Sequence, residues 1–237
     1  RADKAAAWLL LARLYLNAEV YTGTPQWAKA AEYAQKTINS AYSLCPVYKH
    51  LFMADNNGSA VNRANTEIIL PILQDGAATR NYGGSLFLIA STHKTKDMPA
   101  YGTTEGWAGN RCRPQLVKKF FPNGNAPAAG DADAMTKAAN DDRALFFGKD
   151  RTLSVDDASK FENGFSFVKF SNLRADGATT HDSKFTDTDL PLMRLAEAYL
   201  TYAEAEVRRN GGPTAAATEA INTLRKRAHA KTETSYT

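Results

Sequence analysis

The stretch LMRLAEAYLTYAEAE, residues 192–206, decides the fold of this protein, because its pattern Leu-Ala-x-x-Tyr-Leu at 195–200 occurs again at 11–16. In both places a small residue, Ala12 or Ala196, lets a partner helix come close, and the tyrosine one turn later fills the gap beside it. This arrangement is typical of tetratricopeptide-like helix pairs, in which each pair buries its apolar face on a neighbour. We therefore expect a mostly α-helical fold built from such pairs.

The first helix pair is predicted in residues 1–44. Asp3 is the expected N-cap of a helix that reaches about residue 20. After a break, Thr24 is expected to cap a second helix whose first residue is Pro25, a position that proline favours. The short loop between the two helices predicts that they pack antiparallel.

The second helix pair is predicted in residues 190–229. One helix is expected over about 190–209, ended by Gly211-Gly212-Pro213, and another over about 213–229. Stacks of such pairs usually contain three or more, and the chain opens at Arg1 directly into a helix. We therefore expect these residues to be part of a longer protein, with any export signal elsewhere.

Between the pairs, residues 45–189 form a long loop-rich insertion with short strands. Apolar runs predict strands near 67–73 and 165–170, and the glycine turn at 83–84 is expected to lead into another. A short helix is expected from Pro114 to Phe121, and the small polar residues 123–142 indicate a mobile surface segment. Long loops on a rigid scaffold commonly carry binding sites, so we expect the function here.

The composition is that of an ordinary globular protein, with 43% hydrophobic and 23% charged residues and a net charge of +4. That charge gives no argument for nucleic-acid binding. No apolar run is long enough to span a bilayer. Cys45 and Cys112 can pair or stay free, and the sequence leaves this open.

Catalytic and metal-binding signatures are absent from the sequence. The four histidines are scattered, and Gly83-Gly84-Ser85-Leu86 lacks the pattern of a hydrolase elbow. A glycosidase needs two carboxylates about 5–9.5 Å apart. The carboxylates considered for that role are Glu105, Asp131, Asp133, Asp141 and Asp142, of which the last four lie in the polar segment, where solvated side chains are expected. We predict a protein that is not an enzyme and has no cofactor.

Aromatic side chains in glycine-rich loops are the strongest candidates for a binding site. Trp107 lies among glycines, Tyr82 precedes two of them, and Tyr101 precedes one. Such a ring is either an anchor that holds the loop on the core or an exposed platform, and the sequence leaves both open. A platform suits a sugar, whose C–H face packs on an aromatic ring while polar groups bind its hydroxyls. The polar groups nearby in sequence are those of Asn81, Asn110 and Arg111.

Several stretches resemble the SusD/RagB family, and the resemblance covers nearly all 237 residues. The helical stretches KAAAWLLLARLYL (4–16), LMRLAEAYLTYAEAE (192–206) and AINTLRKRA (220–228) are similar to helices of that family. The middle stretches PILQDG (71–76), LFLIAST (86–92) and GWAGNR (106–111) resemble its starch-binding founding member.

The resemblance implies a SusD-like α/α superhelix, with 45–189 as the ligand-binding region. It implies an outer-membrane lipoprotein at the cell surface that binds α-glucan oligosaccharides without cleaving them. Its partner would be a SusC-like TonB-dependent transporter, and a lipid anchor outside these residues would be its membrane contact. Trp107 matches one ring of the aromatic arc that binds starch in the founding member, and Tyr82 matches another.

Two further expectations remain. Some members of the family carry a bound calcium, and Gln74, Asp75, Asp187 and Asp189 would supply oxygen ligands for such a structural ion. The alternative to glycan binding is a tetratricopeptide-like scaffold that binds another protein through its helix faces.

Overall fold

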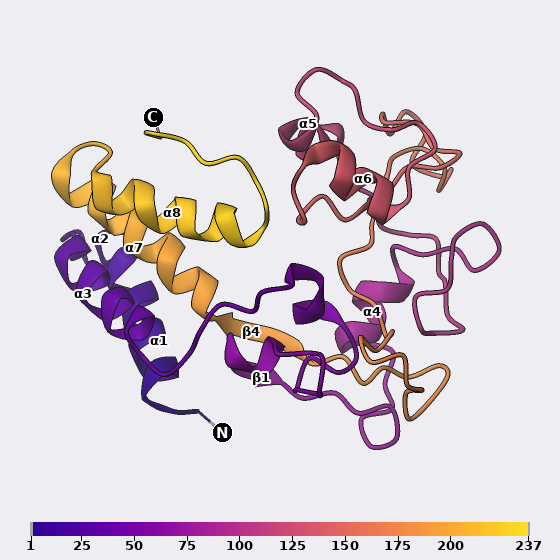
Figure 1. Ribbon diagram of the computed structural model, residues 1–237, viewed down its shortest axis with the longest axis horizontal. Coiled ribbons are helices and arrows are strands. Elements are labelled where there is room, and N and C mark those ends of the chain that lie inside the picture. The colour runs from indigo at the N-terminus through magenta and orange to yellow at the C-terminus, as the bar shows by residue number, and fades with distance from the viewer. Residues whose placement is uncertain (1, 237) are drawn as a thin grey trace. The chain divides into compact units, whose positions relative to one another are not determined.

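The computed structural model describes residues 2–236, and the chain divides into two compact units (Figure 1). The helical unit comprises residues 1–47, 63–72 and 191–237. The loop-rich unit comprises residues 48–62 and 73–190.

The helical unit is built from the two predicted helix pairs. Its helices are α1 (Lys4–Leu16), the short α2 (Ala18–Thr22), α3 (Trp27–Ile38), α7 (Leu195–Asn210) and α8 (Ala215–Arg227). Helix α3 packs against both α1 and α7, and α7 packs against α8. The contacts are made through small residues, because Ala30, Ala31 and Ala205 are buried together with Tyr15 and Tyr202 packed against them. Ala12 and Ala196, the small residues of the repeated pattern, are both buried as well.

The ends of the first helix pair differ in part from the prediction. Asp3 caps α1 as expected, since its carboxylate accepts a hydrogen bond from the N–H of Ala6 at 3.0 Å. The predicted cap at Thr24 and start at Pro25 are wrong, because α3 begins at Trp27. The N–H of Thr24 instead donates to the hydroxyl of Thr22, which holds these residues in a turn.

The second pair begins later than predicted. Residues Leu190–Arg194 form strand β4, which pairs with β1 (Ile68–Ile72) in a two-stranded sheet, and only then does α7 start. In this sheet β4 finds its backbone hydrogen-bond partners in β1, which is distant in the sequence. The helical periodicity of residues 190–209 cannot reveal such a partner. Helix α8 begins close to the predicted point, where the hydroxyl of Thr214 accepts from the N–H of Ala217.

A buried carboxylate ties the helical unit together. Glu67, which is inaccessible to solvent, accepts hydrogen bonds from Arg194 at 2.7 Å and from Arg227 at 2.5 Å. It also accepts one from the backbone N–H of Cys45 at 2.8 Å. Two cations and a backbone donor from three separate segments thus share one buried anion.

The loop-rich unit contains short elements around its own core. They are the 3₁₀ turn η1 (Tyr48–Phe52), helices α4 (Gly84–Ala90), α5 (Pro114–Phe120) and α6 (Ala132–Ala139), and the antiparallel strands β2 (Phe146–Phe147) and β3 (Ser166–Phe167). A further 3₁₀ turn, η2 (Ala64–Thr66), precedes β1 in the helical unit. One apolar cluster of the loop-rich unit consists of Cys112, Val117, Phe121, Met135, Ala144, Phe146 and Phe165.

Two predictions for the loop-rich unit are wrong. The glycine turn at 83–84 leads into helix α4 and not into a strand, and the burial of Leu86, Ile89 and Ala90 follows a helical spacing. The segment 123–142 contains α6, whose Met135 is fully buried and anchors it to the core. The strand expected near 165–170 is confirmed only over Ser166–Phe167.

Candidate functional site

Four aromatic rings form a continuous row in the loop-rich unit. The ring of Trp107 lies 6.2 Å from that of Phe87 and 6.3 Å from that of Tyr82, and Tyr82 lies 5.7 Å from Phe185. We call this set the aromatic row. Tyr82 is 56% exposed and Trp107 is 38% exposed, and their rings are inclined by 41°. The two rings predicted from the sequence are therefore neighbours that both reach solvent.

Hydrogen bonds to the end of α4 hold the loop that carries Trp107. The N–H of Trp107 donates to the carbonyl of Ala90 at 2.8 Å, and the N–H groups of Gly109 and Asn110 both donate to the carbonyl of Ser91. The last carbonyls of a helix lack intrahelical partners, so the loop satisfies groups that would otherwise need water. A side chain at Gly106 would meet the backbone N of Thr95 at 2.8 Å, so glycine permits this close approach.

The loop uses its two large rings in opposite ways. Tyr101 is the anchor: its ring packs edge-on against the buried His93 at 5.2 Å, and burial raises its pKa. Trp107 is the ring that remains open to solvent. The two alternatives left open by the sequence are therefore both realised, one by each ring.

A charged pair that the sequence did not reveal lies beside the two exposed rings. The indole N–H of Trp107 donates to Glu105 at 2.8 Å, and Lys184 lies 3.3 Å from the other oxygen of that carboxylate. The hydrogen bond from Trp107 and the charge of Lys184 lower the pKa of Glu105. The Lys184 ammonium lies 4.9 Å from the centre of the Tyr82 ring, and hydrogen bonding to Tyr82 and then to Glu105 raises its pKa.

The predicted hydroxyl partners have local roles of their own. Asn81 accepts from the N–H of Gly83 and donates to the carbonyl of Thr79, both at 2.9 Å, and so shapes the turn beside Tyr82. Asn110 is exposed and donates to the hydroxyl of Ser91 at 3.1 Å. An amide group has four hydrogen-bonding positions. Both residues therefore keep capacity for a ligand.

Arg111 is more fully engaged. Its guanidinium donates to the backbone carbonyls of Gly109, Ala158 and Asn163 at 2.6, 2.8 and 3.0 Å. Together with Asn110 it lines an open cavity of about 630 Å³. Arg113, Gln115, Ser154 and Asp156 lie in the same wall, whereas Asn81 belongs to the turn at Tyr82. The structure thus brings two of the three predicted polar partners together.

Three of the five carboxylates considered for catalysis have structural partners. Asp131 caps α6 through the N–H of Ala134, and Asp141 forms a 2.6 Å ion pair with Arg143. Glu105 is bound to Trp107 and Lys184.

The two cysteines, whose state the sequence left open, are not paired. Cys45 and Cys112 are both free thiols in buried positions.

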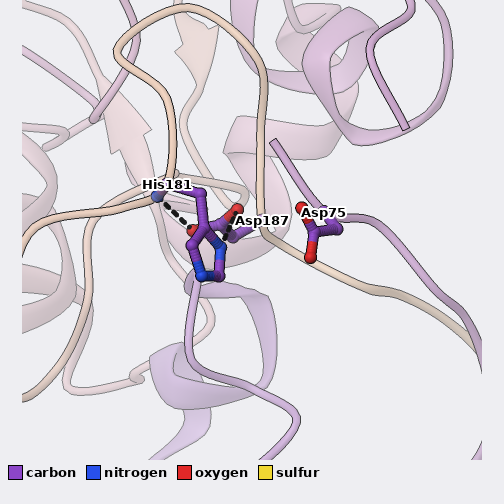
Figure 2. A group of neighbouring side chains, drawn as sticks. All are labelled: Asp75, His181 and Asp187. Atoms are coloured by element: carbon purple, nitrogen blue, oxygen red, sulfur yellow. Dashed lines mark hydrogen bonds and ion pairs between the residues drawn. The ribbon is translucent and has the colours of Figure 1, made fainter. Parts of the chain in front are cut away.

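Acidic residues and a histidine meet elsewhere in the unit. The ligand atoms of Asp75, His181 and Asp187 lie within 4.8 Å of one another, and His181 donates its backbone N–H to Asp187 at 2.9 Å (Figure 2). Asp187 also accepts from the N–H of Gly76, and it raises the pKa of His181. Of the residues predicted to hold calcium, Asp75 and Asp187 are therefore adjacent.

The other two predicted calcium ligands meet at their own contact. The carboxylate of Asp189 accepts from the backbone N–H of Gln74 at 2.8 Å. Burial, and then the charge of Asp187, raise the pKa of Asp189 although that hydrogen bond opposes the shift.

None of the helices formed by residues 2–236 has the length and hydrophobicity needed to cross a membrane.

Comparisons with known proteins identify relatives of the whole chain. A family model described as the SusD family matches residues 17–236. The starch-binding protein SusD of Bacteroides thetaiotaomicron is 48% identical over 259 residues, which are 97% of this chain and 46% of the relative. The chain therefore spans about half the length of this curated relative.

Solved structures share the fold at lower identity. A structure solved with a xylogluco-oligosaccharide has a TM-score of 0.69 at 20% identity, covering 100% of this chain and 46% of its own. A laminarin-binding SusD-like protein has a TM-score of 0.60 at 20% identity, covering 99% of this chain and 49% of its own. The mostly helical fold class predicted from the sequence, with its loop-rich insertion, is confirmed.

Proposed function

This chain belongs to the SusD family, and on that premise we propose that it binds starch-type α-glucan oligosaccharides at the cell surface without cleaving them. The observation that carries the proposal is the pair of exposed, mutually inclined rings of Tyr82 and Trp107. The 48% identity to a protein named for starch binding supports the substrate class.

The chemistry of the pair suits a sugar chain. Each ring covers the C–H face of one sugar. Because the two rings are inclined to each other, the pair fits a curved sugar chain better than a straight one. A ring contact of this kind contributes roughly 1 kcal/mol beyond the area it buries. Two rings therefore give weak binding, which rises when further contacts act on the same chain.

Polar side chains close to Tyr82 and Trp107 in the sequence are the proposed second part of the site. Asn81 and Asn110 retain hydrogen-bonding positions for sugar hydroxyls. Arg111 uses three of its five donors on backbone carbonyls and lines a cavity together with Asn110, so its remaining two donors are proposed ligand donors.

Membership of the family extends the proposal to location and partner. We place the protein at the outer membrane, held by a lipid anchor, where it passes bound glycan to a SusC-like TonB-dependent transporter. It acts as a binding protein in this scheme, and its carboxylates hold structure and take no part in bond cleavage.

A structural calcium is part of the proposal. Asp187 and Asp189 are both buried, and the charge of one raises the pKa of the other. Calcium prefers several oxygen ligands from carboxylates and amides, and it would offset this accumulation of negative charge. Gln74, Asp75, Asp187 and Asp189 are the proposed ligands, and His181 would remain outside the oxygen shell.

The test is calorimetric titration of the protein with maltoheptaose, laminarihexaose and a xyloglucan heptasaccharide. The proposal expects the strongest binding for maltoheptaose, and absence of heat with maltoheptaose would contradict it. Overnight incubation with starch followed by a reducing-end assay is expected to release no sugar.

A second candidate function is a scaffold that binds another protein through its helices. Leu10 and Leu14 lie one turn apart on α1, and Leu200 on α7 is likewise exposed. Such exposed leucines suit an apolar partner surface. Variants of Trp107 that lose glycan binding but still associate with the transporter would separate this role from sugar capture.

A further inference from the structure

The indole of Trp107 is held at its edge by Glu105. With 38% of its surface exposed, Trp107 is only partly restrained by packing. The 2.8 Å hydrogen bond from its N–H to the carboxylate of Glu105 adds a directional restraint on the ring. The backbone N–H of Glu105 donates to the hydroxyl of Thr103 at 3.2 Å, which holds the backbone of Glu105 in place.

Lys184 joins this arrangement to the second ring. Its ammonium lies 3.3 Å from Glu105 and 4.9 Å from the centre of the Tyr82 ring, a distance at which cation–π attraction operates. One ammonium therefore contacts both the carboxylate that holds Trp107 and the face of Tyr82.

The backbones under the two charged residues are bonded to each other. The hydroxyl of Thr103 donates to the carbonyl of Lys184 at 2.7 Å, and the N–H of Thr104 donates to the carbonyl of Ser183 at 2.9 Å. The N–H of Lys184 donates to Asp182 at 2.7 Å. The two segments that carry Glu105 and Lys184 are therefore hydrogen-bonded to each other.

We infer that Glu105 and Lys184 are positioning residues that fix the inclination between Trp107 and Tyr82 and thereby select bent over straight glucan chains. The inference rests on the proposed function. A ring that is already fixed loses little conformational freedom when a ligand binds, which improves affinity for a chain of matching shape. The same fixed angle disfavours a straight chain, because the rings cannot turn to lie flat along it.

The side chains of Lys184 and Glu105 are 35% and 22% exposed. A partly exposed ion pair of this kind contributes little to folding stability, so the variants are expected to fold. Glu105→Ala removes both the indole acceptor and the charge, Glu105→Gln keeps an acceptor oxygen, and Lys184→Met keeps the aliphatic stem. Glu219→Ala and Lys226→Met are matched controls, because this exposed pair at 3.0 Å lies on α8 in the helical unit.

The experiment is calorimetric titration of each variant with maltoheptaose and with cellohexaose. Glu105→Ala keeps the indole ring and is expected to lose about threefold in maltoheptaose affinity, which corresponds to about 0.7 kcal/mol. The ratio of the two affinities is expected to fall by a similar factor. Lys184→Met is expected to lower this affinity ratio as well. Glu105→Gln is expected to lose less maltoheptaose affinity than Glu105→Ala. Both control variants are expected to keep the wild-type affinities.

A second readout follows the ring directly. In protein labelled with 5-fluorotryptophan, the fluorine signal of Trp107 is assigned by its loss in Trp107→Phe. Glu105→Ala is expected to shift and narrow that signal as the indole gains freedom, while the signals of Trp8 and Trp27 stay unchanged. An unchanged Trp107 signal would contradict a restraint by Glu105.

The outcomes distinguish this inference from the proposed function. If Glu105→Ala and Lys184→Met keep the wild-type affinity ratio while Trp107→Ala loses binding, the positioning role is refuted and the binding site stands. An equal loss for both glycans in Glu105→Ala would also refute it. If Trp107→Ala binds maltoheptaose like the wild type, the proposed function itself fails.

Discussion

Tyr82 and Trp107 are both tied to helix α4: Tyr82 lies two residues before its first residue, Gly84, and the N–H of Trp107 donates to the carbonyl of its last residue, Ala90. The helix also carries Phe87, whose ring is 6.2 Å from that of Trp107. A short rigid element therefore sets the spacing of the two exposed rings, and their loops add the orientation.

Replacing Trp107 with alanine is expected to lower maltoheptaose affinity by roughly tenfold, because one stacking contact and its buried area are lost together. Isothermal titration calorimetry measures the change. Tyr21→Ala is the matched control, since Tyr21 is an aromatic residue of the helical unit that is 67% exposed. An equal loss in both variants would argue against a specific role for Trp107.

Removing the charge of Glu67 is expected to destabilise the helical unit strongly. In Glu67→Ala the guanidinium of Arg227, which is 7% exposed, loses its ion pair with Glu67 in the interior. Breaking a buried pair in this way typically costs about 3–5 kcal/mol. Urea denaturation measures the loss, and Glu219→Ala, which breaks an exposed pair, should change stability by less than about 1 kcal/mol.

Mild acid is expected to destabilise the loop-rich unit through His93. Burial lowers the pKa of this side chain, and backbone carbonyls around it only partly offset the effect. The backbones of Met98, Pro99 and Glu105 lie near the ring, but among residues 2–236 none makes a hydrogen bond of normal geometry with either ring nitrogen. The unfolded chain then binds a proton near the ordinary pKa of about 6.5 while the folded chain does not, so stability falls as pH drops below that value.

Urea midpoints at pH 7.5 and pH 5.5 measure this effect in the wild type and in His93→Phe. The variant should lose less stability on acidification, because its ring cannot titrate. Burial also lowers the pKa of His50, so a smaller slope should remain. Identical slopes for the two proteins would show that His93 does not contribute.

Calcium is expected to raise the melting temperature. A ligand that binds only the folded state raises the free energy of unfolding by about 2.7 kcal/mol when its concentration is 100 times its Kd. Thermal scans with calcium, with magnesium and with a chelator measure the shift, and Asp189→Asn should reduce it. If millimolar calcium leaves the melting temperature unchanged, the proposed ion site is wrong.

Both cysteines are expected to resist thiol reagents in the native protein. Burial raises the pKa of Cys112 to about 12 and also raises that of Cys45, so little thiolate is present at neutral pH. A colorimetric thiol assay should detect almost no reaction in buffer and two thiols in urea. Rapid reaction of one thiol in buffer would indicate local opening around it.

Local patterns in the sequence were enough to predict the helix pairs. The repeated small residue and tyrosine, the cap at Asp3 and the start of α5 at Pro114 all act over one or two turns, and each is present in the structure. Short apolar runs were less informative, because a run such as 85–89 suits a strand or a helix equally. There the interpretation as a strand was wrong, since packing of the loop against the end of α4 favours the helix.

For the candidate site too, the sequence predicted some residues and only the tertiary structure showed the others. Glycine-rich context marked Tyr82, Tyr101 and Trp107 as rings with a special role, but the exposure of Trp107 and the packing of the half-buried Tyr101 follow from contacts with α4 and His93. The pairing of Glu105 with Lys184 had no signal in the sequence. Local patterns record forces between residues near in the chain, whereas partners far apart in the chain meet only through packing of the whole unit.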